Sequence, residues 1–447
     1  MKAQEVLDDL RRRFPNEPEY LQAVEEVLTT IEDVYNEHPE FEHYNLIERL
    51  CIPDRIFSFR VSWVDDKGKV QNNMGYRIQH NNAIGPYKGG IRFHSSVNQS
   101  ILKFLAFEQT FKNSLTTLAM GGAKGGSDFS PRGKSNMEVM RFCQAFISEL
   151  WRQIGPDTDV PAGDIGVGAR EVGYMYGMYK KMARENTGTF TGKGMEFGGS
   201  LMRPEATGYG NVYFLLNMLA TRDIDIKGKR VAISGSGNVA LYTAEKLISL
   251  GAKVVSMSDS DGCVIIADGM TKEQFDYLFK LKIEYRGRIR EFAEEYPGAV
   301  TYHEGCRPWK LVQCDIAMPS ATQNELNGED AKALIDGGTF AVSEGANMPS
   351  TPDAIKEFLA ARILYAPGKA ANAGGVSVSG LEMAQNSQKI NWTAEEVDNK
   401  LKAIMADIHR QCETYGRESD GYINYVRGAN VSGFMKVARA MMAQGIL

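Results

Sequence analysis

The feature that most constrains the fold is a short glycine-containing turn between an apolar strand and an amphipathic helix. The segment RVAISGSGNVALYTAEKLISLGAKVVSMSD places Gly235, Gly237 and Ala240 in the spacing G-x-G-x-x-A. The first glycine allows the tight bend, the second lets the backbone approach a pyrophosphate, and the small third residue lets helix and strand pack closely. Because the strand–turn–helix–strand context is complete and acidic residues follow at about the expected distance, the segment predicts a dinucleotide site.

Strand–helix alternation continues beyond this turn through the apolar segments KVVSMSD, CDIAMPS, TFAVSEGA and RILYAPG. Alternation of that kind predicts a parallel sheet with helices on its faces. The N-terminal part reads differently, with amphipathic helices over 3–14 and 19–37, strands around a hairpin between 55 and 80, and helices over 101–118 and 137–154.

The predicted fold class is therefore α/β with two domains, since 447 residues exceed one ordinary core. We expect an N-terminal α/β domain over residues 1–199 and a Rossmann-like dinucleotide-binding domain over 200–422, separated by a cleft. A C-terminal helix, about 423–447, is expected to pack back on the first domain. We expect the cleft to close about the crossings near residue 200 and residues 370–420.

Composition excludes several function classes. A net charge of −5 gives no basic field for nucleic acid. No run of about 18 apolar residues predicts a membrane span, and the N-terminus has no apolar signal segment. The six cysteines are scattered without a CxxC spacing, which indicates free thiols in a reducing cytoplasm and no metal site.

Three lysines stand in distinctive contexts: Lys88 in GPYKGGIRF, Lys112 in FEQTFKNSLT and Lys124 in GGAKGGSDF. Each alone could be a surface charge, but together with Asp164 in PAGDIGVG they favour a site. Clustered cations raise the cost of protonating each one, so a desolvated lysine can become neutral near pH 8 and act as a base. The remaining cations would bind carboxylates. The pattern predicts an anionic substrate with more than one carboxylate that undergoes proton and hydride transfer.

The ordered motifs PYKGGIRF, EQTFKNSLT, MGGAKGGSDF, PAGDIGVG, FGGSLMRPEATGYG, SGSGNVA and NAGGVSVSGLEMAQNS carry a family resemblance. From about residue 40 to the C-terminus the chain resembles the hexameric bacterial and fungal class of glutamate dehydrogenases. The resemblance implies reversible oxidative deamination of glutamate to 2-oxoglutarate and ammonium with NAD or NADP, a homohexamer, and a first domain that binds substrate and oligomerises.

The resemblance also implies residue roles. Lys124 matches the catalytic lysine that activates water, and Asp164 matches the proton-transfer carboxylate. Lys88 and Ser379 match the residues that hold the side-chain carboxylate. The remaining matches hold the α-carboxylate, line the side-chain pocket or contact the coenzyme: Gln109 and Lys112 with backbone help at Gly89 and Gly163; Val376; and Thr207, Asn238, Gly235, Gly237, Val239 and Ser260.

Simpler interpretations stand beside three of these roles. Ser379 alone reads as an ordinary loop or cap serine. Asp164 could be a turn aspartate, and Thr207 precedes a helical run and could be a helix cap.

Coenzyme preference is open between NADP, which we favour, and NAD or dual use. Asp259 and Asp261 could hold a ribose 2′-hydroxyl, which favours NAD. The stretch SDSDG, however, differs from the glycine-proline version in a strictly NAD-using relative. Tyr285 lies where some NADP-using relatives carry a basic residue. Basic residues downstream could meet a 2′-phosphate or form a solvated helix face: Lys282, Arg286 and Arg288.

Three other functions compete. A dehydrogenase of an apolar amino acid would share the catalytic lysine and aspartate but would not need Lys88 and Ser379. A catalytically silent scaffold would carry degenerate catalytic residues, and none are degenerate here. A decarboxylating malic-type enzyme would need an acidic cluster for a divalent metal, which the sequence lacks.

Overall fold

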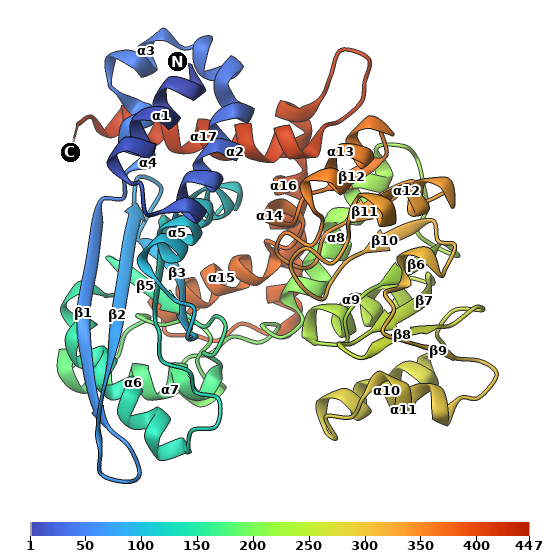
Figure 1. The fold of residues 1–447 in the computed structure, drawn as a ribbon, viewed down its shortest axis with the longest axis horizontal. Helices are drawn as coiled ribbons and strands as arrows, with labels where there is room; N and C mark the ends of the chain where they lie inside the picture. Colours follow the sequence, from blue (N-terminus) through green and yellow to red (C-terminus); the bar gives the residue numbers. More distant parts are fainter. Residues whose placement is uncertain (1, 447) are drawn as a thin grey trace. The chain divides into compact units, whose positions relative to one another are not determined.

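A computed structural model describes residues 2–446, and its backbone contacts divide the chain into two compact units. Unit 1 contains the described parts of Met1–Leu201, Val376–Val397 and Asn430–Leu447, and unit 2 contains Met202–Gly375 and Asp398–Ala429. Each unit has its own sheet, labelled in Figure 1. No helix of the described residues is both long enough and apolar enough for a bilayer.

Unit 1 is built on a five-stranded sheet of order β1-β2-β4-β3-β5. Strand β2 runs antiparallel to both β1 and β4, whereas β3 runs parallel to both β4 and β5. The strands are β1 (Arg55–Val64), β2 (Val70–Asn81), β3 (Tyr87–Phe93), β4 (Gly122–Ser127) and β5 (Asp159–Ala162). The helices and 3-10 turns are α1 (Ala3–Arg13), α2 (Pro18–Asn36), α3 (Pro39–His43), α4 (Leu46–Cys51), α5 (Gln99–Leu115), α6 (Asn136–Leu150), η1 (Trp151–Gln153), α7 (Ala169–Ala183) and η2 (Met195–Phe197).

The β1–β2 hairpin forms at the predicted turn. The Asp65 carboxylate accepts the backbone N–H groups of Lys67 and Lys69 at 2.9 Å, and Gly68 has a φ of +78° that a side chain would disfavour. The full register from Arg55 opposite Gln79 to Val64 opposite Val70 follows from this tight closure.

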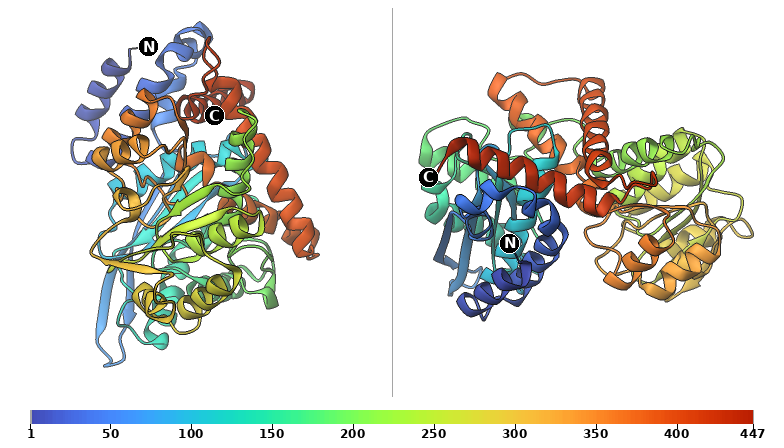
Figure 2. Two further views of the ribbon diagram at one scale, coloured as in Figure 1. Left: turned by 90° about the vertical axis from the view of Figure 1, so that its right-hand side faces the viewer. Right: turned by 90° about the horizontal axis from the view of Figure 1, so that it is seen from above.

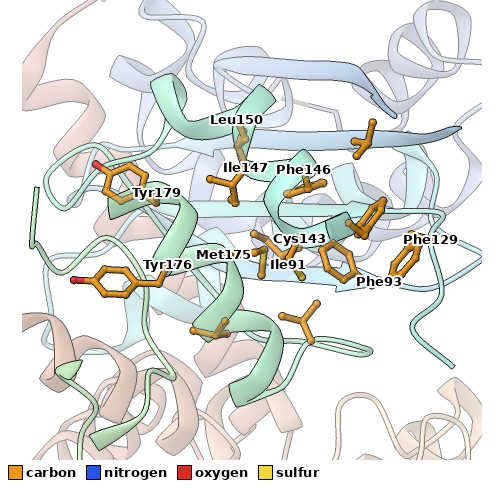
Figure 3. Close-up of a cluster of buried hydrophobic side chains, with 14 of the residues drawn as sticks. Ile91, Phe93, Phe129, Cys143, Phe146, Ile147, Leu150, Met175, Tyr176 and Tyr179 are labelled. Atoms are coloured by element: carbon orange, nitrogen blue, oxygen red, sulfur yellow. The ribbon is translucent and has the colours of Figure 1, made fainter. Parts of the chain in front are cut away.

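Helices α6 and α7 cover one face of this sheet with an aromatic-rich core. Figure 3 shows Phe93, Phe129 and Phe146 gathered beside Ile91, and all four side chains are essentially buried. Helix α6 begins with a capping box in which Ser135 and Glu138 exchange hydrogen bonds with each other's backbone N–H groups. Burial of such side chains contributes about 1.5–3 kcal/mol each, which fixes the sheet that bears the site.

The end of the chain packs on its beginning. In helix α17 (Tyr425–Gln444), Phe434 contacts the rings of Tyr35 and Phe41, with centroid separations of 6.2 and 5.8 Å. Both views in Figure 2 place this red helix beside the blue N-terminal helices. The C-terminal part of the chain is thus integral to unit 1.

Unit 2 contains a seven-stranded sheet of order β12-β11-β10-β6-β7-β8-β9. Its strands are β6 (Arg230–Ile233), β7 (Lys253–Ser258), β8 (Gly262–Ile265), β9 (Thr301–Glu304), β10 (Ile316–Met318), β11 (Ala341–Ser343) and β12 (Leu364–Ala366). The helices are α8 (Ala206–Ala220), α9 (Asn238–Ser249), α10 (Lys272–Ile283), α11 (Ile289–Glu295), η3 (Pro308–Lys310), α12 (Gly328–Asp336), α13 (Pro352–Ala360) and α14 (Gly368–Ala371). Helices α15 (Gly374–Gln388), α16 (Ala394–Gly416) and α17 run through the boundaries between the units.

The predicted parallel sheet is confirmed for the five strands in the order β12-β11-β10-β6-β7. Strand β8, however, pairs antiparallel with β7, and β9 pairs antiparallel with β8. Only residues 259–261 separate β7 from β8, and a parallel connection needs a crossover of a dozen or more residues. The short link therefore forces the chain to reverse.

The contact-based division also differs from the predicted domain ranges. Its first boundary lies after Leu201, close to the predicted 199, but residues 376–397 belong to unit 1 rather than to the nucleotide-binding part. Helix α15 explains this, because Glu382 binds the 192–193 segment of unit 1.

Candidate active site

Lys124 and Asp164 meet in unit 1, as the proposed catalytic roles require. Lys124 lies on β4, and Asp164 follows β5 in the turn at residues 163–167. The Lys124 Nζ lies 3.2 Å from Asp164 Oδ2, and the Arg92 Nε donates to the same oxygen at 2.7 Å. Only 6% of Lys124 is exposed. Two cations therefore share one carboxylate oxygen in a secluded position.

The environment tunes both groups. Burial lowers the pKa of Lys124, and the charge of Asp164 only partly opposes this. For Asp164, burial alone would raise the pKa, but the charges of Lys124 and Arg92 outweigh it, so its pKa lies below the usual range. A lysine poised toward neutrality beside a carboxylate that stays ionised is suited to proton transfer.

The glycines around Lys124 serve close packing of the protein itself. A Cβ atom on Gly122 would lie 2.0 Å from Thr110 Oγ1 of α5, and one on Gly89 would lie 1.6 Å from the Ala123 carbonyl oxygen. The sequence interpretation gave the glycines a role toward a ligand; in the structure their first task is to let β3, β4 and α5 approach one another.

Lys88 is a buried cation on the neighbouring strand β3. Its side chain is 1% exposed, and its Nζ donates to Thr191 Oγ1 at 2.8 Å. Keeping an ammonium group away from water is costly unless polar or anionic groups surround it. Lys88 is therefore a buried cation that has the Thr191 hydroxyl as one polar partner.

Helix α5 brings the predicted α-carboxylate residues to the same strand. The Asn113 Nδ2 donates to the Lys88 carbonyl oxygen at 3.1 Å, and the Gln109 Nε2 donates to Asn113 Oδ1 at 2.6 Å. Lys112 lies three residues after Gln109, on the same helix face, and is half-buried. Gln109 is thus linked through Asn113 to the backbone of Lys88, and Lys112 lies on the same helix.

Ser379 lies inside α15 and not in a loop, so its interpretation as a loop or cap serine is wrong. It is 3% exposed and stands three residues before Glu382, whose carboxylate accepts the backbone N–H of Gly192 at 2.8 Å. Residues three apart are neighbours on a helix surface, so Ser379 lies on the side of α15 that carries Glu382. Val376, near the start of the same helix, is half-buried.

Gly163 packs closely against Gly90 of β3, next to Asp164. A Cβ atom on Gly90 would lie 2.7 Å from the Gly163 carbonyl oxygen, while Gly89 pairs with Pro161 of β5. The backbone around Gly89 and Gly163 is therefore close-packed.

The predicted dinucleotide turn is built as expected in unit 2. Gly235 has a φ of +86°, and a Cβ atom there would lie 2.8 Å from the Ser320 carbonyl oxygen. No heavy atom lies within 4 Å of a Cβ atom built on Gly237, which leaves space where a pyrophosphate would approach. Helix α9 then begins at the exposed Asn238 without a side-chain cap, so its N–H groups can bind an anion. Val239 is half-buried beside Asn238, and Ala240 is fully buried.

Thr207 is the second residue of α8, and the N-cap position belongs to Glu205, so the helix-cap interpretation of Thr207 is wrong. A Cβ atom on Gly375 would lie 2.6 Å from Thr207 Oγ1. This glycine leaves the half-buried hydroxyl of Thr207 room at the start of the helix.

The loop after β7 shows how the acidic and basic residues are arranged. Asp259 accepts the backbone N–H groups of Asp261 and Ile289 at 2.9 Å, so its carboxylate organises the loop. The Arg288 NH1 donates to the exposed Ser260 Oγ at 3.0 Å, and its Nε lies 3.2 Å from Asp261. Lys282 lies 3.7 Å from Asp259, whereas Tyr285 and Arg286 are exposed.

Comparisons with known proteins agree with this geometry. The profile described as Glutamate/Leucine/Phenylalanine/Valine dehydrogenase matches residues 198–445, and the profile of the Glu/Leu/Phe/Val dehydrogenase dimerisation domain matches residues 53–181. The chain belongs to the glutamate/leucine/phenylalanine/valine dehydrogenase family. Among residues 2–446, no group of three or more His, Cys, Asp or Glu side chains is placed to hold a metal ion.

Individual relatives of this dehydrogenase family cover the whole chain. A glutamate dehydrogenase of Bacteroides thetaiotaomicron is 72% identical over 100% of both chains. An NAD(P)-specific glutamate dehydrogenase of Xylanibacter ruminicola is 68% identical, again over 100% of both. The crystal structure of Plasmodium falciparum glutamate dehydrogenase is 49% identical, with a TM-score of 0.96 over 100% of this chain and 95% of that one.

Two residues of the candidate site, Arg92 and Thr191, were not predicted from the sequence. Arg92 stands two and four residues after Gly90 and Lys88 on β3, so strand alternation could have placed it on the Lys88 face. Thr191 gave no such signal, because it lies outside any regular element and reaches Lys88 only through the fold.

Proposed function

We propose that this protein is an NAD(P)-dependent glutamate dehydrogenase that interconverts L-glutamate and 2-oxoglutarate with ammonium. The observation that carries the proposal is the buried ammonium group of Lys88, which donates to Thr191 Oγ1 at 2.8 Å. A side-chain carboxylate of the substrate can form a charge-assisted hydrogen bond with this ammonium group, whereas an apolar side chain cannot.

Substrate binding follows from the positions of the cations. Lys88 and Ser379 hold the side-chain carboxylate, and Gln109 with Lys112 holds the α-carboxylate, with backbone help from Gly89 and Gly163. When both carboxylates of a five-carbon dicarboxylate are held, its Cα and amino group lie at Lys124 and Asp164. The reacting groups are then already oriented for the chemical step.

The chemical step uses the Lys124–Asp164 pair. Asp164, kept ionised by Lys124 and Arg92, accepts a proton from the substrate ammonium group. Bound NAD or NADP supplies a hydride acceptor for Cα. Lys124, whose pKa burial lowers, activates the water that attacks the resulting imine carbon and stabilises the charge that develops there.

The residues of the glycine turn fit a dinucleotide. Gly235 and Gly237 shape the backbone, and the uncapped start of α9 at Asn238 and Val239 offers N–H groups to the pyrophosphate. We assign Thr207 and Ser260 to further coenzyme contacts. Because Asp259 is engaged by backbone N–H groups and Arg288 stands at Ser260, we favour NADP while expecting NAD to be used as well.

A paired assay tests the proposal. Purified protein with 2-oxoglutarate and ammonium should consume NADPH or NADH, followed by the loss of nicotinamide absorbance. Lys124→Ala should lower kcat by at least about a hundredfold, since acid–base groups contribute roughly 10²–10⁴, and should leave coenzyme binding measurable by fluorescence titration. Absence of turnover with both coenzymes would rule the proposal out in favour of a silent scaffold.

The oligomeric state is part of the proposal. We propose a homohexamer in the cytoplasm, supported by the resemblance of the whole chain and by the match of residues 53–181 to a dimerisation domain. Light scattering coupled to gel filtration should give the mass of six chains of 49.5 kDa. A monomer mass would contradict it.

A further inference from the structure

A second buried ion pair lies one helix turn from Ser379. Lys193 Nζ and Glu382 Oε1 are 2.9 Å apart, and their side chains are 1% and 0% exposed. Lys193 also donates to Asn386 Oδ1 at 2.7 Å and lies over the Tyr176 ring at 5.7 Å. None of these residues has a role in the proposed reaction.

The pair fixes a backbone segment as well as two side chains. The two oxygens of Glu382 accept the backbone N–H groups of Gly192 at 2.8 Å and Lys193 at 3.3 Å. The Lys193 ammonium reaches back to the carbonyl oxygen of Phe190. Thr191 lies between these anchored residues, and its own N–H donates to the Pro161 carbonyl oxygen at 3.0 Å. The hydroxyl that contacts Lys88 is therefore held from both sides.

Helix geometry links the same pair to Ser379. Positions 379, 382 and 386 follow the spacing i, i+3, i+7, which lines one face of α15. Glu382 and Asn386 both bind the segment at residues 188–198, since Asn386 Nδ2 also donates to the Gly198 carbonyl oxygen at 2.7 Å. Docking this face sets the distance of Ser379 from that segment.

We infer that Glu382 and Lys193 are positioning residues for substrate selectivity: together they hold Thr191 and Ser379 around the Lys88 ammonium and so define the site for the substrate's side-chain carboxylate. The inference rests on the proposed function, because it takes Lys88 as the partner of that carboxylate. Burial lowers the pKa of Lys193, and the negative charge of Glu382 partly opposes this shift.

The test is the selectivity of Glu382→Gln for glutamate over norvaline, which lacks the side-chain carboxylate. Glutamine keeps an oxygen acceptor for the backbone N–H groups but removes the charge that balances Lys193. We expect kcat/KM for glutamate to fall about tenfold, equivalent to about 1.4 kcal/mol, while kcat/KM for norvaline changes less than about twofold. Glu382→Asp, which keeps the charge, should recover part of the selectivity.

A matched control is the Lys103–Glu17 pair, which is also buried in unit 1, with a separation of 2.6 Å and the Lys103 ammonium 3.4 Å from the Phe14 ring centroid. Glu17→Gln should lower the Tm, as Glu382→Gln does, without changing selectivity. Equal losses for both substrates in Glu382→Gln, or unchanged selectivity, would overturn the inference and leave the pair a purely structural one.

Two further variants complete the experiment. If Glu382→Gln does not fold, the double variant Lys193→Met with Glu382→Met removes both charges together, and its selectivity should fall in the same way. Lys88→Leu, measured in parallel, separates the two claims: if it does not lose selectivity, the proposed carboxylate site is wrong, whereas loss in Lys88→Leu with no change in the Glu382 variants contradicts only this inference.

Discussion

At the scale of single residues, the decisive contact is the convergence of Arg92 and Lys124 on one oxygen of Asp164. Arg92 lowers the pKa of both partners through its charge, and Arg77 adds to the effect on Lys124. With Oδ2 occupied by two cations, we expect Oδ1 to take the substrate proton.

Replacing Arg92 should move the pH dependence in a definite direction. In Arg92→Met the pKa values of Asp164 and Lys124 both rise, because a nearby positive charge is lost. The carboxylate then protonates, and the lysine becomes neutral, at higher pH than in the wild type. The pH profile of kcat/KM for glutamate should shift upward, while Arg92→Lys should stay close to the wild type. A downward shift would contradict these assignments.

We expect Arg288 to contribute to coenzyme preference. Arg288→Ala removes the guanidinium group at Ser260 and should raise KM for NADPH about tenfold, equivalent to about 1.4 kcal/mol, with KM for NADH changed less than about twofold. Arg290→Ala is the control, because the exposed Arg290 pairs with Glu294 at 3.5 Å. Equal effects on both coenzymes would exclude a role toward the 2′-phosphate.

Sequence reasoning identified most of these residues because short motifs hold them. Lys88, Lys124 and Asp164 stand in glycine-rich contexts, and the structure brings Lys124 and Asp164 into contact. Thr191 and Glu382 could not be predicted, since their partners lie 103 and 190 positions away in the chain. Only the tertiary fold creates those contacts.

At the scale of elements, glycines decide whether the sheet of unit 1 can close. Gly89→Ala places a methyl group against the Ala123 carbonyl oxygen, which neither strand can avoid. We expect a loss toward the upper end of the roughly 1–3 kcal/mol that overpacking costs, measured by denaturant unfolding. Gly177→Ala, in α7 with open space around the new Cβ atom, should be neutral or stabilising by up to about 1 kcal/mol. Similar losses in both variants would contradict this account of the glycines.

Helices and strands were predicted correctly where polar and apolar residues alternate with a clear period. They were missed where a segment is buried on all sides and shows no such period. The hairpin and the α9 turn were predicted because alternation and turn chemistry coincide there. Helix α15 was missed because residues 377–382 are buried on every side, so no polar face marks the helical period. Its glycines and serines also weaken intrinsic helix propensity.

At the scale of the whole molecule, the chain passes between the two units after residues 201, 375, 397 and 429. The proposed substrate residues fall in unit 1 and the proposed coenzyme residues in unit 2, so hydride transfer requires the two sets to meet. We expect solution scattering to give a smaller radius of gyration with 2-oxoglutarate and NADPH together than without them. Identical scattering curves would count against closure.

Lys88→Leu tests most directly whether Lys88 makes this enzyme select a dicarboxylate substrate. The variant removes a charged hydrogen-bond donor, a contact worth about 1.5–3 kcal/mol, so kcat/KM for glutamate should fall roughly 10- to 150-fold. The new apolar surface should leave kcat/KM for norvaline unchanged or higher. A parallel fall for glutamate and norvaline would contradict the claim.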